Sequence, residues 1–267
     1  MAQNDGEHRM LFDIRGRRKN VVKVVYAVLA ILMGASLFLV AGPVNIGEIF
    51  GDSATSNAAS QFEDRAVKIE QQLKKEPEDP NLLLALTRQR LYAGNARSET
   101  NPETGAVQLT VEARQQFEQA SSTWSEYLEA TDEPSSSGAQ LVAPMLFSLA
   151  ETSTTVGEAE ANLTGAANAQ RLVAEKRPSL GSLSTLAIYT YFTFDYAAAA
   201  KAGSEAGKYA NTKFERETLE NQLEDSEERA KETEKSFAEF NKATQGQGKE
   251  ALQSPLGGLS GGSSLSP

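Results

Sequence analysis

An apolar segment close to the start of the chain constrains the fold more than any other feature. No charged residue occurs between Val24 and Ile46, and a cluster of basic residues comes directly before this run. A helix of about 20 residues covers the roughly 30 Å of hydrocarbon in a bilayer, and a lysine at its edge can extend its ammonium group to the lipid headgroups. Residues 21–42 therefore predict one transmembrane helix.

Two other interpretations of this segment are open. A buried core helix would be shorter or would carry a polar face, whereas nearly every position of this segment is apolar. A cleaved signal peptide usually has an apolar core of about 7–15 residues, followed by a small-x-small site. The nearest such site, Val40-Ala41-Gly42, is followed directly by Pro43, which should hinder cleavage. We therefore favour an uncleaved anchor.

The charges that flank this segment predict its orientation. The other flank has no lysine or arginine before Arg65 and instead carries Glu48 and Asp52. Basic residues concentrate on the cytoplasmic side of a membrane helix. We therefore expect residues 1–20 to form a cytoplasmic tail and most of the chain to lie outside. The residues that determine this topology are Arg15, Arg17, Arg18, Lys19 and Lys23.

The outer part of the chain is strongly acidic. The first 23 residues hold six of the 26 basic and three of the 36 acidic residues, which leaves 20 basic against 33 acidic residues beyond them. Nucleic-acid binding depends on neutralising phosphates, and anionic lipid headgroups likewise attract basic surfaces. The composition therefore argues against a nucleic-acid partner and against wide contact with lipid headgroups.

Metal and cofactor chemistry has little support in the sequence. The chain has no cysteine, and its one histidine, His8, lies in the predicted cytoplasmic tail. Structural and catalytic zinc sites need several histidine or cysteine ligands. No phosphate-binding glycine loop, nucleophile elbow or paired metal-binding histidine motif occurs either. We expect no metal, no cofactor and no enzymatic activity.

The composition divides the outer part into four segments. Residues 43–60 are small and polar, which predicts a flexible spacer, and residues 246–267 are rich in glycine and serine, which predicts a disordered tail. Residues 61–210 should form a helical domain and residues 211–245 one long helix. The whole is predicted to be all-α, because no convincing run alternates with the period of a strand.

Apolar spacing and helix-stop signals place the individual helices. We expect helices over residues 62–75, 80–94, 111–133, 139–151, 157–177, 180–194, 197–210 and 213–242. Gly94 is expected to end the second of these, as glycine often does at a helix C-terminus. Carboxylates are frequent in the last helix, and such residues normally form a solvated face.

The helices show signs of a repeat. Between residues 183 and 206, large and small apolar residues alternate at the spacing of a tetratricopeptide repeat, in which small residues let two helices pack closely. The stretch PNLLLALTRQRLYAGN fits the same frame, with Gly94 at the turn. A non-repetitive helical bundle would produce much of this pattern, so that alternative stays open.

The chain also resembles a known group of proteins. MLFDIRGRRKNVVKVVYAVLAILMG is similar to the start of single-pass, tetratricopeptide-like membrane proteins of actinobacteria, and LKKEPEDPNLLLALTRQRLYAGN and W..YL....EP are similar to their repeat region. The resemblance implies a membrane-anchored bacterial scaffold of the cytoplasmic membrane. In layout the chain is also similar to the ancillary subunit of the bacterial Sec translocon, which implies a place near the export machinery. No binding residue carries over from either likeness.

The last helix has two interpretations. Its apolar and small residues step by four and three in alternation, from Leu219 and Leu223 to Phe237 and Phe240, as in a coiled coil. It could cap the end of a helical stack, or it could be an arm that binds partners or a second copy of the chain. Both could hold, with the two leucines packed inward and the two phenylalanines free.

These observations predict a binding protein. Stacked helix pairs offer an extended surface for peptides or partner domains, and large aromatic residues are frequent anchors in such interfaces. We predict a membrane-anchored scaffold that binds protein or peptide partners outside the membrane. The alternative is a structural protein that forms homo-oligomers through its C-terminal helix. The candidate partner-binding residues are Trp124, Tyr127, Tyr189, Tyr191, Phe192, Phe237 and Phe240.

Overall fold

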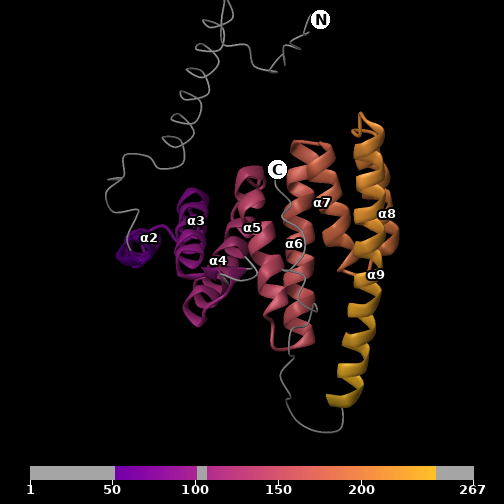
Figure 1. Ribbon diagram of the computed structural model, residues 1–267. Helices are drawn as coiled ribbons and strands as arrows, with labels where there is room; N and C mark the ends of the chain where they lie inside the picture. Colours follow the sequence, from indigo (N-terminus) through magenta and orange to yellow (C-terminus); the bar gives the residue numbers. More distant parts are fainter. Residues whose placement is uncertain (1–51, 101–106, 245–267) are drawn as a thin grey trace, which may run out of the picture. The chain divides into compact units, whose positions relative to one another are not determined.

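The computed structural model describes residues 52–100 and 107–244, which form eight α-helices and one very short β-hairpin (Figure 1). The predicted all-α class is confirmed. The predicted cytoplasmic tail, the transmembrane helix over 21–42 and the tail over 246–267 lie outside the described residues. The helices are α2 (Asp52–Leu73), α3 (Pro80–Arg97), α4 (Val111–Glu129), α5 (Ser136–Glu151), α6 (Val156–Lys176), α7 (Leu180–Tyr191), α8 (Tyr196–Gly207) and α9 (Lys213–Thr244).

Within residues 52–100 and 107–244, no helix combines the length and the apolar character that a membrane crossing requires.

The helices begin where the sequence supplies capping side chains. The Asp79 carboxylate, for example, accepts a hydrogen bond of 2.8 Å from the backbone N–H of Asn81, and Pro80 occupies the first helical position. Such caps satisfy backbone donors that the first turn leaves unpaired. This is why the predicted starts of α3 to α8 lie within a few residues of those in the structure. Side chains that cap in the same way before α4 to α8 are Thr110, Ser135, Thr155, Ser179 and Asp195.

Three local predictions differ from the structure. The spacer predicted over 43–60 overlaps α2, which begins at Asp52, because its alanines and serines are compatible with a helix. Gly94 does not end α3, which continues to Arg97. The loop after α3 contains two short antiparallel strands, β1 (Glu99–Thr100) and β2 (Val107–Gln108), where no sheet was expected.

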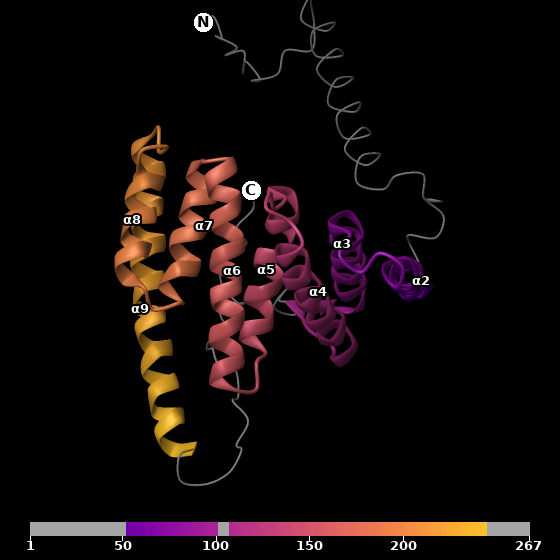
Figure 2. The same cartoon turned by 180° about the vertical axis from the view of Figure 1, so that it is seen from behind.

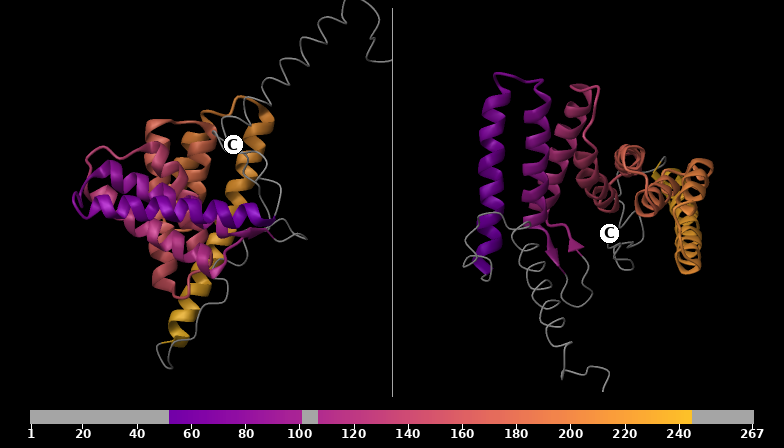
Figure 3. Two further views of the ribbon diagram at one scale, coloured as in Figure 1. Left: turned by 90° about the vertical axis from the view of Figure 1, so that its left-hand side faces the viewer. Right: turned by 90° about the horizontal axis from the view of Figure 1, so that it is seen from above.

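The helices pack mainly as neighbours in the sequence. The most extensive contacts join α5 to α6, α3 to α4, α2 to α3, and α7 to α8. Figures 1 and 2 show these helix pairs following one another in chain order, with α9 lying against α7 and α8. The view from above in Figure 3 shows the same order from α2 to α9. Each pair therefore buries its apolar faces chiefly against itself and the adjacent pair.

Two apolar clusters form the core. The first extends over α3 to α7 and includes Trp124, and the second extends over α5 to α9 and includes Phe237. Phe147 belongs to both, because its ring stacks on Tyr189 with centroids 4.7 Å apart and meets Phe192 edge-on at 5.4 Å. This aromatic contact links the α5–α6 pair to the α7–α8 pair.

Polar contacts reinforce the packing of helix α2 on α3. Arg97 of α3 forms a forked ion pair with Glu63 of α2 through hydrogen bonds of 3.2 and 3.0 Å. Arg90, about two turns earlier on α3, pairs with Glu70, about two turns later on α2, because the two helices are antiparallel. Gln116 of α4 accepts a hydrogen bond from Arg90 and donates one to Glu63. The three helices therefore share one polar network.

We expect the Glu63–Arg97 pair to make a measurable contribution to stability. Both side chains are about two-thirds buried, and forked arginine–carboxylate pairs are stronger than isolated surface pairs. A double-mutant cycle of Glu63→Ala and Arg97→Ala should give a coupling free energy of about 0.5–1 kcal/mol, which falls in 1 M salt. The exposed pair Lys235–Glu239 is the matched control and should give a coupling near zero. Equal coupling in the two pairs would contradict this interpretation.

Candidate interaction surface

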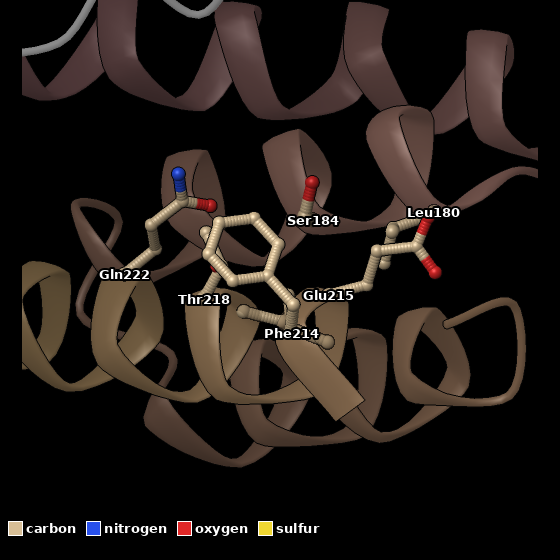
Figure 4. A pocket seen from close by; sticks show the side chains of 7 residues that line it. Leu180, Ser184, Phe214, Glu215, Thr218 and Gln222 are labelled. Atoms are coloured by element: carbon tan, nitrogen blue, oxygen red, sulfur yellow. The ribbon is translucent and has the colours of Figure 1, made fainter. Parts of the chain in front are cut away.

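A small apolar pocket opens between the first turns of α7 and α9 (Figure 4). Its volume is about 110 Å³. Phe214 stands beside it with 77% of its surface exposed, which is unusual for so large an apolar side chain. The residues that line the pocket are Leu180, Ser184, Phe214, Glu215, Thr218, Leu219 and Gln222.

The two helix starts that form the pocket are rigidly capped. Ser179 and Ser182 form a reciprocal capping box at the start of α7. At the start of α9, the Glu215 carboxylate accepts hydrogen bonds from the backbone N–H groups of Asn211 and Thr212, at 2.7 and 2.9 Å, and these bonds lower its pKa. The helix starts on both sides of the pocket are thus fixed by hydrogen bonds between capping side chains and backbone N–H groups.

The spacing of the helices depends on one glycine. A Cβ atom on Gly203 of α8 would lie 2.6 Å from a methyl group of Leu223 on α9, so any larger residue would make this leucine side chain move. Leu223 in turn keeps α9 close to the α7–α8 pair, below the pocket. Gly203 lies within the predicted repeat over residues 183–206, and in the structure it makes room for Leu223 of α9.

The pocket has the chemistry of a site for an uncharged apolar group. Ser184 donates its hydroxyl hydrogen to the Gly181 carbonyl at 3.0 Å, and the Glu215 carboxylate is occupied by its cap. The remaining lining is aliphatic, aromatic or neutral and polar, and it includes no basic residue. We therefore expect it to accept an aliphatic side chain with a neutral backbone rather than a phosphate or a metal ion.

The predicted aromatic anchors are in the core rather than on this surface. Trp124, Tyr127, Tyr191, Phe192 and Phe237 are each at most 5% exposed, and Tyr189 is 9% exposed. A side chain buried against neighbouring helices has no surface left for a partner. The proposal that these six residues bind partners is therefore wrong for this structure.

The heptad positions of α9 are also used within the fold. Leu219, Ala230 and Phe237 are buried, and Phe240 packs against the second cluster. Phe237 meets the ring of Phe194, which lies in the turn between α7 and α8 with a left-handed φ of 64°. Helix α9 therefore caps the stack, and a coiled coil between two copies would need a different face of this helix.

Phe214 was missed by the sequence reasoning, although a signal was present. It lies outside the four-and-three spacing that begins at Leu219, so it falls on a different side of the same amphipathic helix. A large aromatic residue off the packed face is expected to be exposed.

Glu151 is a second unusual group, at the C-terminal end of α5. Burial raises the pKa of its carboxyl group to about 7, and burial together with this carboxylate raises the pKa of Tyr189 to about 12. The group lies where the α5–α6 pair meets α7. A carboxylate in this position opposes folding whenever it is ionised.

We expect Glu151→Gln to stabilise the protein at high pH. The folded-state pKa lies above the unfolded value of about 4.5, so the cost is absent below pH 4.5, grows as the pH rises towards 7 and is complete above 7. The free energy of unfolding should rise by about 1–3 kcal/mol at pH 8. At pH 4.5 this gain should vanish. Glu160→Gln, at an exposed position of α6, is the control in urea unfolding, and an equal gain there would refute the assignment.

The described residues contain no cluster of three or more acidic or histidine side chains that could hold a metal ion. Comparison with protein-family models, curated proteins and solved structures finds no match. The functional argument therefore depends on the residues of this chain alone.

Proposed function

We propose that this protein is a membrane-anchored, tetratricopeptide-like scaffold that binds protein or peptide partners through the pocket between α7 and α9. The anchor is the apolar segment over residues 21–42, and the binding domain lies on the extracytoplasmic face of a bacterial cytoplasmic membrane. The pocket holds one apolar side chain of the partner, and Phe214 covers it.

The repeat interpretation is supported best by α7, α8 and α9. Ala187 of α7 and Ala199 and Ala206 of α8 are fully buried where these two helices meet. Leu180 and Ser184 face the first turns of α9, while Tyr191, whose pKa burial raises, lies close enough to Glu227, further along α9, for this carboxylate to raise that pKa as well, so α7 and α9 run in the same direction. That is the arrangement of equivalent helices in consecutive repeats. The pocket then lies in the groove between two such helices, the kind of surface that helical repeats use for binding.

The observation that carries the binding proposal is the exposure of Phe214 beside an open apolar pocket. Exposing this ring to water is unfavourable, at roughly 25 cal/mol per Å² of apolar surface. An aromatic residue next to a preformed pocket is the usual composition of an interface anchor. The neighbouring exposed aromatic, Tyr209, is 40% exposed and does not line the pocket.

The location is supported by the charge pattern of the sequence. Five basic residues precede the apolar segment at short range, whereas the flank after it is acidic. The long acidic part that follows would then be outside the cell membrane. A scaffold there would meet partners of the cell envelope or newly exported chains.

Site-specific photocrosslinking in cells tests the binding proposal. A photoreactive phenylalanine analogue is placed at position 214 of the full chain, and in a second strain at position 209. We expect a discrete crosslinked partner from position 214 and little or none from position 209. Co-purification in mild detergent should lose the same partner in Phe214→Ala and retain it in Tyr209→Ala. A partner that is captured equally from both positions, or from neither, would count against the pocket.

A further inference from the structure

The pocket between α7 and α9 has a candidate occupant within the chain itself. The chain continues after α9, which ends at Thr244, for the segment 245–267. From Ala251 to Pro267 this segment has no charged residue and contains four leucines among glycine, serine and proline. In a chain with 62 charged residues, 26 basic and 36 acidic, so neutral a stretch is conspicuous.

The chemistry of the segment matches that of the pocket. No lining residue is basic, so an acidic occupant would find no partner charge, and the one carboxylate, Glu215, accepts the backbone N–H groups at the start of α9 through its Oε2 atom. A cavity of roughly 150 Å³ holds a benzene ring, so a pocket of about 110 Å³ suits one branched aliphatic side chain. A leucine flanked by glycine and serine brings the aliphatic group without bulky neighbours.

The length of the segment decides which leucine can arrive. From Thr218, in the pocket, to Thr244 the helix rises about 39 Å at 1.5 Å per residue. An extended chain advances at most about 3.3–3.6 Å per residue. Leu252 is eight residues past the helix end and reaches only about 29 Å, whereas Leu259 is 15 residues past it and reaches about 50 Å. Leu252 therefore cannot reach the pocket, and Leu256, 12 residues past the helix end, reaches about 40 Å with almost no slack. Leu259 and Leu265 reach it with slack, and of these two only Leu259 has a glycine beside it.

We propose that residues 245–267 fold back along α9 and place Leu259 in the pocket beside Phe214. The segment covers the exposed ring and occupies the pocket as an internal ligand. Because it is tethered, its effective concentration is in the millimolar range, which is enough to oppose weak ligands without a tight contact. A partner that binds there must displace it. This regulatory consequence rests on the proposed function, whereas the docking itself does not.

Engineered cysteine pairs test the docking directly, because the chain has no cysteine of its own. The full chain in detergent carries Phe214→Cys with Leu259→Cys, and disulfide formation is followed under dilute, mildly oxidising conditions. The first control is Phe214→Cys with Leu252→Cys, which the reach forbids. The second is Glu220→Cys with Leu259→Cys, since Glu220 is exposed on the side of α9 opposite the pocket and is nearer to Thr244.

We expect an intramolecular disulfide between positions 214 and 259 to form at least ten times faster than one between positions 220 and 259. No disulfide should form between positions 214 and 252. Equal rates at positions 214 and 220, a disulfide only between two copies, or no disulfide at all would overturn the proposal. The disulfide assay needs no partner, so its result is valid even if photocrosslinking at position 214 captures no partner.

Photocrosslinking of a partner at position 214 then separates docking of the segment from its competition with the partner. If the segment docks in the pocket and competes with a partner there, deletion of residues 246–267 should raise the yield of partner crosslinked at position 214 at least threefold. An unchanged yield together with the 214–259 disulfide would show that the segment docks but does not compete. That result would overturn the regulatory part of the proposal alone.

Discussion

Replacing Gly94 with alanine is expected to lower the free energy of unfolding by about 1–3 kcal/mol, the usual range for overpacking in a core. The new Cβ atom would overlap the aromatic ring of Phe117, where helices α3 and α4 approach most closely. A phenylalanine ring cannot bend away as the end of an aliphatic chain can. The two helices would have to separate, and the first apolar cluster would lose contacts on both sides.

Urea unfolding followed by circular dichroism measures this effect, and Gly157→Ala is the matched control. Gly157 lies in the first turn of α6 with nothing within 4 Å of an added Cβ atom, so alanine there should be neutral or slightly stabilising. A Gly94→Ala variant as stable as Gly157→Ala would mean that α3 and α4 do not meet at this residue. The pairing of these two helices would then be wrong.

Replacing Phe237 with alanine should cost about 3–4 kcal/mol, as for other buried phenylalanines. The ring is 3% exposed and packs edge-on against Phe194 at 5.8 Å. Its loss would leave a cavity beneath α9 and remove the contact that holds the unusual backbone of Phe194. The same substitution at Phe214, an exposed position of the same helix, should change stability by less than about 0.5 kcal/mol.

This pair of variants separates the two interpretations of α9. If the helix caps the stack, Phe237→Ala destabilises the whole domain and Phe214→Ala does not. If the second half of the helix were a free arm, both variants would unfold at the same denaturant concentration as the unaltered protein. Denaturant midpoints measured with a common m-value decide between these outcomes.

The helices could be predicted from the sequence because their signals are local. Apolar spacing and the capping residues before α3 to α8 depend only on residues within a turn or two of each helix start. The beginning of α2 could not be predicted in this way. Its first residues resemble a spacer, and only the contacts of its later residues with α3 explain why a helix forms there.

The role of individual residues was harder to predict because it depends on the neighbouring helix. Gly94 was read as a helix stop, which is the commonest use of glycine, but here it provides room for Phe117. The aromatic residues at helical spacing could equally have faced a partner or the core. Their burial against other helices of the chain decides for the core, and no local pattern contains that information.

The repeat signal is clearest in α7 and α8 for a geometric reason. The successive units begin at Pro80, Ser136, Leu180 and Lys213, so only the last spacing approaches the 34 residues of a tetratricopeptide repeat. The first unit has a long connection with a β-hairpin between its helices, and the second has a longer final helix. These insertions moved the remaining small residues out of the expected frame.

One labelling measurement tests most directly whether the predicted anchor places the pocket between α7 and α9 outside the membrane. The variant Phe214→Cys carries the only thiol of the chain, at an exposed site. Intact, wall-stripped cells are treated with a maleimide that does not cross membranes, and the membrane and medium fractions are then separated. Asn4→Cys, in the predicted cytoplasmic tail, is the matched control.

We expect position 214 to be labelled in intact cells and to stay with the membrane, while position 4 is labelled only after lysis. This result would support an anchored domain that presents its pocket outside the membrane. Labelling of position 214 only after lysis would place the pocket in the cytoplasm, and labelled protein in the medium would mean that the apolar segment is cleaved. Either of these outcomes would contradict the proposed scaffold.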